Sequence, residues 1–89
     1  MNISFDHAKD AANLAKHGVS LAEAVNIEWD TLRGIPDARR DYGEARMIGY
    51  AILADRLYCV VFTDRGTVRR IISLRKANAR EVRDYAAND

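Results

Sequence analysis

An alternating pattern of apolar and polar positions between residues 57 and 77 predicts a β-hairpin. Leu57–Thr63 is apolar and rich in strand-forming residues, and Asp64-Arg65-Gly66 supplies residues typical of a turn. In the second strand, Thr67–Arg75, successive side chains should point to opposite faces. One predicted face carries Val68, Arg70, Ile72 and Leu74. The other carries Thr67, Arg69, Ile71, Ser73 and Arg75. Arginine forks match phosphate oxygens, so this second face could hold a polyanion.

Two helices are predicted ahead of the hairpin. The first covers His7–Lys16, with Asp6 as its N-cap and Gly18 as the left-handed residue that ends it. Its spacing predicts a small-residue face against a sheet, made of Ala8, Ala11, Ala12 and Ala15. A neighbouring polar face carries Lys9, Asn13 and Lys16. A second, short helix should begin at Ser20, in a capping box with Glu23, and end near residues 26–29.

The remaining segments complete the predicted order of elements. Ile3–Phe5 and Arg46–Leu53 have the composition of strands, and Ala54-Asp55-Arg56 should form the turn into the hairpin. Residues 30–45 lose the pattern and predict a loop or a mobile edge, with breakers at Gly34, Pro36 and Gly43. A last helix should follow Asn78, which can form a capping box with Glu81.

This order of strand, two helices, three antiparallel strands and helix predicts an α+β fold. We expect a small, mostly antiparallel sheet with helices packed on one side, in a single domain over residues 1–89. Neither a membrane-spanning run nor a signal-peptide pattern is evident, which predicts a cytoplasmic protein. Cys59 is the only cysteine and lies among apolar residues, so we expect a buried, inert thiol.

The positive charge is concentrated in one part of the chain. Residues 65–83 hold seven basic groups against Glu81 alone, a net charge of +6, whereas residues 1–64 carry a net charge of −3. Such a local field is typical of nucleic-acid binding, although a solvated charged face explains it about equally well.

Three blocks of sequence occur in a fixed order over nearly the whole chain. The first comprises Phe5-Asp6-His7-Ala8-Lys9, Asn13, Lys16-His17-Gly18-Val19-Ser20 and Glu23-Ala24. The second comprises Gly43-Glu44-Ala45-Arg46 and Gly49. The third comprises residues 60–66 (VVFTDRG), residues 70–77 (RIISLRKA), Glu81 and Tyr85. In this order the blocks resemble the BrnT family, the toxin half of a bacterial type II toxin–antitoxin pair. Phe5 and Leu74 depart from that family's usual tryptophan and alanine.

The resemblance implies a RelE-like fold and a metal-independent endoribonuclease toxin that needs no cofactor. Such a toxin cleaves RNA and arrests growth. The resemblance also implies a cognate BrnA-like antitoxin, a ribbon-helix-helix protein, in a hetero-oligomer for which 2:2 is one arrangement. The complex would contact operator DNA only through the antitoxin. A second hypothesis is a non-catalytic module that binds nucleic acid or the antitoxin and acts as a transcriptional co-repressor.

Metal-independent RNA cleavage needs groups that stabilise a phosphorane and move protons. Arg65 at the hairpin tip and Arg75 at the end of its second strand are the leading candidates for charge stabilisation, although either could be a surface residue. His17 suits proton transfer but also suits a helix C-terminus. Glu44 and Arg46 could form a base and a phosphate clamp, or only a salt bridge.

Further residues are candidates for binding the RNA backbone or a base. They are Lys9, Arg69, Ser73, Lys76, Arg80, Arg83 and Tyr85. The two histidines lack cysteine or carboxylate neighbours at ligand spacing, so the sequence predicts no metal site.

Overall fold

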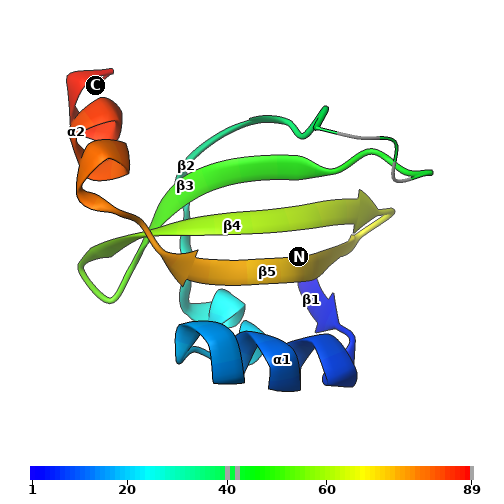
Figure 1. Cartoon of the computed structure of the whole chain (residues 1–89). Helices are drawn as coiled ribbons and strands as arrows, with labels where there is room; N and C mark the ends of the chain where they lie inside the picture. Colours follow the sequence, from blue (N-terminus) through cyan, green and yellow to red (C-terminus); the bar gives the residue numbers. More distant parts are fainter. Residues whose placement is uncertain (40, 42, 89) are drawn as a thin grey trace.

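The protein is a five-stranded sheet with helices at both of its faces (Figure 1). The computed structural model describes residues 1–88 except Arg40 and Tyr42. The strand order is β1-β5-β4-β3-β2, with β1 parallel to β5 and the other neighbours antiparallel. The strands are β1 (Asn2–Phe5), β2 (Glu28–Pro36), β3 (Met47–Leu53), β4 (Arg56–Arg65) and β5 (Val68–Lys76). The predicted α+β class with a mostly antiparallel sheet is therefore confirmed.

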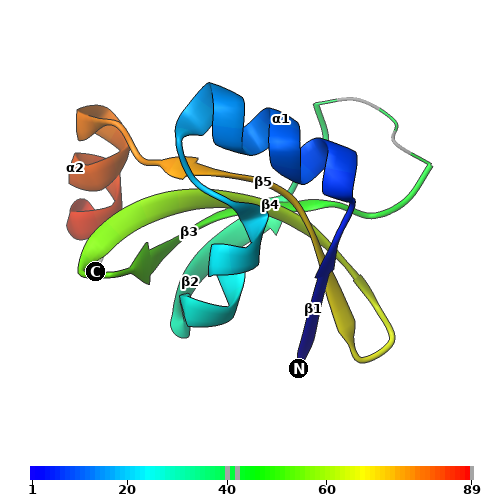
Figure 2. The same ribbon diagram turned by 90° about the horizontal axis from the view of Figure 1, so that it is seen from below.

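One face of the sheet is covered by helix α1 (His7–His17) and the 3₁₀ helix η1 (Leu21–Asn26), as Figures 1 and 2 show. Between this face and the helices lies the core, which consists of Leu21, Ala24, Ile27, Ala51, Leu53, Val60, Phe62, Ile71 and Leu74. Trp29 packs edge-on against Phe62 at its border. We call this side the inner face. None of the described helices is long and apolar enough to cross a membrane.

Helix α1 packs through polar side chains, so the predicted alanine face is wrong. Ala8, Ala11, Ala12 and Ala15 are all exposed, whereas Asn13 is buried. The Asn13 amide donates to the carbonyl oxygen of Leu74 at 2.8 Å and accepts from the Leu74 N–H at 3.2 Å. Because Asn13 bonds the backbone of β5, the turn of the helix that carries it must face the strand and the alanines face solvent.

The helix caps were predicted partly correctly. Asp6 caps α1 by accepting from the Lys9 N–H, and Gly18 ends it with φ of 73°. The capping box at Ser20 is wrong, because its hydroxyl accepts from the Ala22 N–H instead of that of Glu23. A long-range contact replaces the box, since the Asp10 carboxylate accepts from the Ser20 hydroxyl and from the Leu21 N–H.

Of the two predictions for residues 30–45, a loop or a mobile edge, the loop is wrong for the first part, because β2 extends to Pro36 as an edge strand. Arg40 and Tyr42 of this segment lie outside the described residues. The strand lies at the edge of the sheet, where Gly34 and Pro36 are tolerated. The backbones of β2 and β3 lie close together at Gly49. A Cβ at this position would lie 2.9 Å from the Arg33 carbonyl oxygen and 3.0 Å from Gly34 Cα. Glycine at position 49 therefore lets β2 and β3 come together.

The predicted alternation of β5 fails at a β-bulge. Phe62 pairs with Ile71 but Val61 pairs with Ser73, so Ile72 is an extra residue in β5. Because of this extra residue, the odd-numbered and even-numbered residues of β5 exchange faces at Ile72. Arg69 consequently lies on the inner face with Ile71, instead of sharing a face with Ser73 and Arg75 as predicted. The opposite side, here called the outer face, carries Ile35, Ile48, Tyr50, Cys59, Val61, Thr63, Arg70, Ser73 and Arg75.

Helix α2 (Ala79–Ala87) begins with the predicted capping box between Asn78 and Glu81. In Figure 1 it stands at the left end of the sheet, on the opposite side from α1, and there Glu81 bonds to Tyr50 and Arg75 of the outer face. The predicted packing of helices on one side of the sheet therefore holds for α1 and η1 but is wrong for α2, because Glu81 bonds it to the outer face. Cys59 is buried with 3% of its surface exposed, as predicted, and burial raises the pKa of its thiol.

Candidate active site

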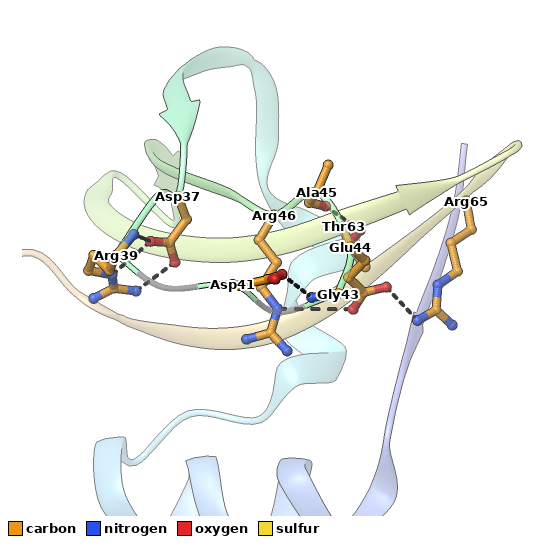
Figure 3. Close-up of polar contacts among 9 residues, drawn as sticks. All are labelled: Asp37, Arg39, Asp41, Gly43, Glu44, Ala45, Arg46, Thr63 and Arg65. Atoms are coloured by element: carbon orange, nitrogen blue, oxygen red, sulfur yellow. Dashed lines mark hydrogen bonds and ion pairs between the residues drawn. The ribbon is translucent and has the colours of Figure 1, made fainter.

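The Glu44 carboxylate lies between two arginines at one end of the outer face (Figure 3). Arg65 donates to it at 2.7 Å from the end of β4, and the Arg46 guanidinium lies 4.0 Å from its other oxygen. The Thr63 hydroxyl donates to the Ala45 carbonyl at 2.6 Å, which fixes the segment between Glu44 and Arg46 against β4. Three of the predicted catalytic residues are therefore brought together.

Arg70 joins this group, although it is not among the site residues predicted from the sequence. It pairs with Thr63 on the outer face, and its guanidinium lies 4.0 Å from the Asp6 carboxylate. The hydrogen bond from Arg65 is the largest cause that holds the pKa of Glu44 below its ordinary value, with further lowering by the charges of Arg46 and Arg70. The bulge at Ile72 turns Arg70 to this side, and only the pairing of β4 with β5 reveals it. We call Glu44, Arg46, Arg65 and Arg70 the arginine cluster.

A second group of predicted residues lines a shallow groove between α1 and the edge of β5. The groove has a volume of about 210 Å³, and its lining includes Lys9, Lys16, His17 and Ser73. His17 lies at the C-terminal end of α1, whereas Asp6 and Arg70 lie at its start. At about 1.5 Å rise per residue, His17 is therefore about 16 Å from Asp6 along the helix axis.

Arg75 belongs to a third group at the opposite end of the outer face. Its guanidinium donates two hydrogen bonds to Glu81, at 2.8 and 2.9 Å, and Tyr50 donates to the same carboxylate at 2.7 Å. The bonds from Arg75 are the largest cause that lowers the pKa of Glu81 to about 2. Burial, followed by the bond to Glu81, raises the pKa of Tyr50 to about 12. Glu81 is thus ionised and Tyr50 neutral at physiological pH.

The candidates for RNA contact are divided between the two faces. Arg69 lies on the inner face, where its guanidinium stands 4.2 Å from the Phe62 ring centroid and bonds to Asp64 at 2.7 Å. Lys76 pairs with Tyr58 on the same inner side. On α2, Arg80 and Arg83 are exposed. The Tyr85 hydroxyl donates to the Thr31 carbonyl, which ties α2 to β2.

What the arginine cluster can do follows from its composition. Three guanidinium groups around one ionised carboxylate can bind a phosphate and place a proton acceptor beside it. Among the described residues, no group of three or more His, Cys, Asp or Glu side chains is placed to hold a metal ion.

The chain matches a known protein family over most of its length. Residues 5–81 match the family described as "Ribonuclease toxin, BrnT, of type II toxin-antitoxin system". The chain belongs to the BrnT family. The matched span includes the whole arginine cluster, the groove beside α1 and the Arg75–Glu81 pair. It ends within α2, so Arg83 and Tyr85 lie outside it.

A solved structure supports the fold of this BrnT chain. The ribonuclease toxin BrnT of Brucella abortus, known at 1.1 Å resolution, superposes with a TM-score of 0.71 at 23% sequence identity. The similarity covers 88% of this chain and 97% of the Brucella chain. No curated protein sequence matches the chain. Membership in the family makes this chain a ribonuclease toxin of the type II class, whose partner is an antitoxin.

Proposed function

We propose that the chain is a metal-independent endoribonuclease that cleaves RNA in the cytoplasm at the arginine cluster and thereby arrests growth. The observation that supports this most directly is the position of Glu44, 2.7 Å from Arg65 and 4.0 Å from Arg46 on the outer face. Arg65 is 60% exposed, so a phosphate can reach its guanidinium from solvent. The cluster combines phosphate-binding donors with an acceptor for a proton.

The reaction uses the substrate's own 2′-hydroxyl as the nucleophile. Glu44 accepts the proton of the 2′-hydroxyl, and the 2′-oxygen forms a bond to the adjacent phosphorus. Arg46, Arg65 and Arg70 stabilise the additional negative charge of the phosphorane. The bond from phosphorus to the 5′-oxygen then breaks, and this oxygen takes a proton from solvent. The products are a 2′,3′-cyclic phosphate and a 5′-hydroxyl.

The low pKa of Glu44 makes it a weak base in the free protein. The largest cause of this lowered pKa is the hydrogen bond from Arg65, and the charges of Arg46 and Arg70 lower it further. A phosphate that binds these arginines brings a negative charge close to Glu44 and competes for the Arg65 donors. Both effects raise the pKa of Glu44, so its basicity increases when the substrate is in place.

The other predicted residues then flank the cleavage site. His17 lies about 16 Å from Asp6 along α1. Arg75 lies about 13 Å from Arg70 along the sheet, because the extra residue Ile72 adds no length against β4. Because Arg75 is bonded to Glu81 and His17 lines the groove beside α1, we assign neither to the phosphate at the arginine cluster. We assign the RNA backbone to the groove of Lys9, His17 and Ser73 on one side. On the other side we assign it to Arg75 and to the exposed Arg80 and Arg83. Arg69 is left out, because its guanidinium is held over Phe62 on the inner face.

The antitoxin is proposed to be a BrnA-like ribbon-helix-helix protein that covers the outer face. Occluding the arginine cluster would block access of RNA, which supports neutralisation by direct contact. The complex is a hetero-oligomer, for which 2:2 is one arrangement, and it reaches operator DNA through the antitoxin alone.

Incubation of the purified chain with naked RNA in EDTA tests this function. We expect cleavage that leaves 2′,3′-cyclic phosphate ends. Glu44→Gln should lower the rate by about 100-fold or more, because it removes the general base. The matched control is Glu28→Gln, an exposed glutamate at the start of β2, which should cleave like the wild type.

Absence of cleavage by the wild type in EDTA would contradict the proposal. A binding module that acts as co-repressor, or a nuclease that needs the ribosome, would then explain the fold better. Equal rates for Glu44→Gln and the wild type would instead move the chemistry away from the arginine cluster.

A further inference from the structure

A pocket of about 220 Å³ lies between α2 and the outer face, at the end remote from the arginine cluster. Strands β2 and β3 contribute Arg33 and Tyr50, and α2 contributes Arg80, Asp84 and Tyr85. Pockets for drug-sized ligands span about 300 to 1,000 Å³. This pocket therefore has room for one small planar group.

The walls of the pocket are fixed by bonds within the protein. The Tyr85 hydroxyl donates to Thr31, and the Arg33 guanidinium lies 4.6 Å from the centroid of the Tyr85 ring and donates to the Tyr85 carbonyl. The Tyr50 hydroxyl is engaged by Glu81. Arg33 covers one side of the Tyr85 ring, whereas Tyr50, with its hydroxyl bonded to Glu81, offers a ligand its aromatic ring. Planar bases stack on such surfaces.

The two carboxylates at the pocket differ in what they can offer a ligand. Glu81 already accepts from Arg75, Tyr50 and the Asn78 N–H. No residue within the described part of the chain donates a hydrogen bond to the Asp84 carboxylate, and Asp84 is exposed. Among the described carboxylates at this pocket, Asp84 is therefore the one with both oxygens available.

A carboxylate offers two acceptors side by side. On the Watson–Crick edge of guanine, N1–H and N2–H₂ present two donors side by side, whereas adenine and cytosine present one donor next to an acceptor. A single carboxylate thus discriminates in favour of guanine. Arg80 and Arg33 add positive charge beside the pocket, which suits the phosphates that flank a base.

We propose that this pocket binds one unstacked guanine of the RNA substrate, stacked against Tyr50 and read by Asp84. The inference rests on the proposed function and adds a base preference to it. Tyr50 pairs with Cys59, four residues from Thr63 along β4, which is about 13 Å. Stacked nucleotides are about 3.4 Å apart and unstacked ones further, so the guanine lies about two to four nucleotides from the cleaved bond.

The test is cleavage of a library of short single-stranded RNAs, followed by sequencing of the ends. The wild type should favour guanine at one fixed position, two to four nucleotides from the cut, by roughly 10- to 100-fold. Asp84→Asn replaces one acceptor by a donor, which matches adenine and cytosine, so its preference should shift from guanine to these two bases. Asp55→Asn removes the same charge in the β3–β4 turn, outside this pocket, and should keep the guanine preference.

Cleavage without a base preference at a fixed position, or an unchanged guanine preference in Asp84→Asn, would overturn the proposal while leaving the nuclease intact. A change in antitoxin affinity alone would assign the pocket to a protein interface and also overturn it. If the wild type cleaves no RNA, the proposed function fails, and titration with guanosine and adenosine monophosphates tests the pocket separately. There we expect about 10-fold tighter binding of the guanine nucleotide, reversed in Asp84→Asn, and equal affinities would overturn it.

Discussion

The side chain of Asn13 supplies β5 with hydrogen bonds that a longer β1 would otherwise provide. The pairing of β1 with β5 ends at Phe5 and Ile71, which leaves the backbone of Leu74 at the edge of the sheet. Asn13 satisfies both the N–H and the carbonyl of Leu74, and it also donates to the Val19 carbonyl at 2.9 Å. One buried amide thus joins α1, β5 and the start of the next segment.

Asn13→Ala should lower the free energy of unfolding by about 2–4 kcal/mol, because it leaves buried backbone groups of Leu74 without partners. The matched control is Asn26→Ala, at an exposed asparagine whose side chain donates to Glu23 at 3.3 Å, and its stability should change by less than about 0.5 kcal/mol. Urea denaturation measures both. Equal midpoints for the two variants would contradict this role of Asn13.

Residues whose partners lie nearby in the chain could be predicted from the sequence. The caps at Asp6 and Asn78 bond to backbone groups three residues away, so their local pattern is sufficient. Asn13 and Leu74 are 61 residues apart, and nothing in the helical pattern distinguishes Asn13 from a solvated polar residue. The site shows the same limit, because Glu44 and Arg46 could be selected locally and Arg70 could not.

At the scale of elements, α2 is attached to the sheet mainly by polar contacts. No side chain within α2 is fully buried, and the helix is held through Glu81 and Tyr85. The Arg75–Glu81 pair and the bond from Tyr50 to Glu81 therefore decide whether the helix stays in place. Docking of this kind depends on the charge of Glu81 and hence on pH.

Acid should weaken this docking. The pKa of Glu81 falls from an ordinary 4.5 to about 2 in the folded protein, so the carboxylate stabilises the fold fully above about pH 4.5. That stabilisation is lost as the pH falls from about 4.5 to about 2. Glu81→Gln should melt at a lower temperature than the wild type at pH 7, and the two melting temperatures should converge near pH 2. Glu28→Gln should keep the wild-type pH dependence, and a constant gap between Glu81→Gln and wild type would contradict the argument.

Two elements differ from their sequence pattern because of their neighbours. β2 contains Gly34 and Pro36, which locally favour a loop, but its backbone pairs with β3 from Arg33 to Pro36. β5 alternates regularly in sequence, yet its register against β4 shifts between Val61 and Phe62. Both features depend on contacts between strands, which a single strand does not encode.

At the scale of the molecule, the basic stretch of residues 65–83 is divided between two faces. Arg69 and Lys76 belong to the inner face, where Arg69 stabilises the border of the core. Arg70 and Arg75 belong to the outer face, and Arg65 lies at the end of β4 beside Glu44. The sequence correctly indicated a basic surface, whereas the bulge decides which arginines belong to it.

Three groups of residues follow one another along the outer face. The arginine cluster lies at one end, Arg75 and the pocket under α2 lie at the other, and Ser73 lies between them. An RNA strand that follows β5 can contact all three in succession. A protein that covers this face would block the proposed cleavage site and the proposed base pocket together, which is the effect we propose for the antitoxin.

The measurement that tests this account most directly compares Arg70→Ala with Arg69→Ala, the same change at adjacent positions. We predict that Arg70→Ala lowers the RNA cleavage rate by about 100- to 1,000-fold, as expected for loss of a group that stabilises the phosphorane. Its free energy of unfolding should change by less than about 0.5 kcal/mol. Arg69→Ala should instead lose about 1–2 kcal/mol of stability, through the contacts with Phe62, Trp29 and Asp64, while its folded fraction cleaves like the wild type. Loss of cleavage in Arg69→Ala with full activity in Arg70→Ala would contradict both the bulge and the site built on it.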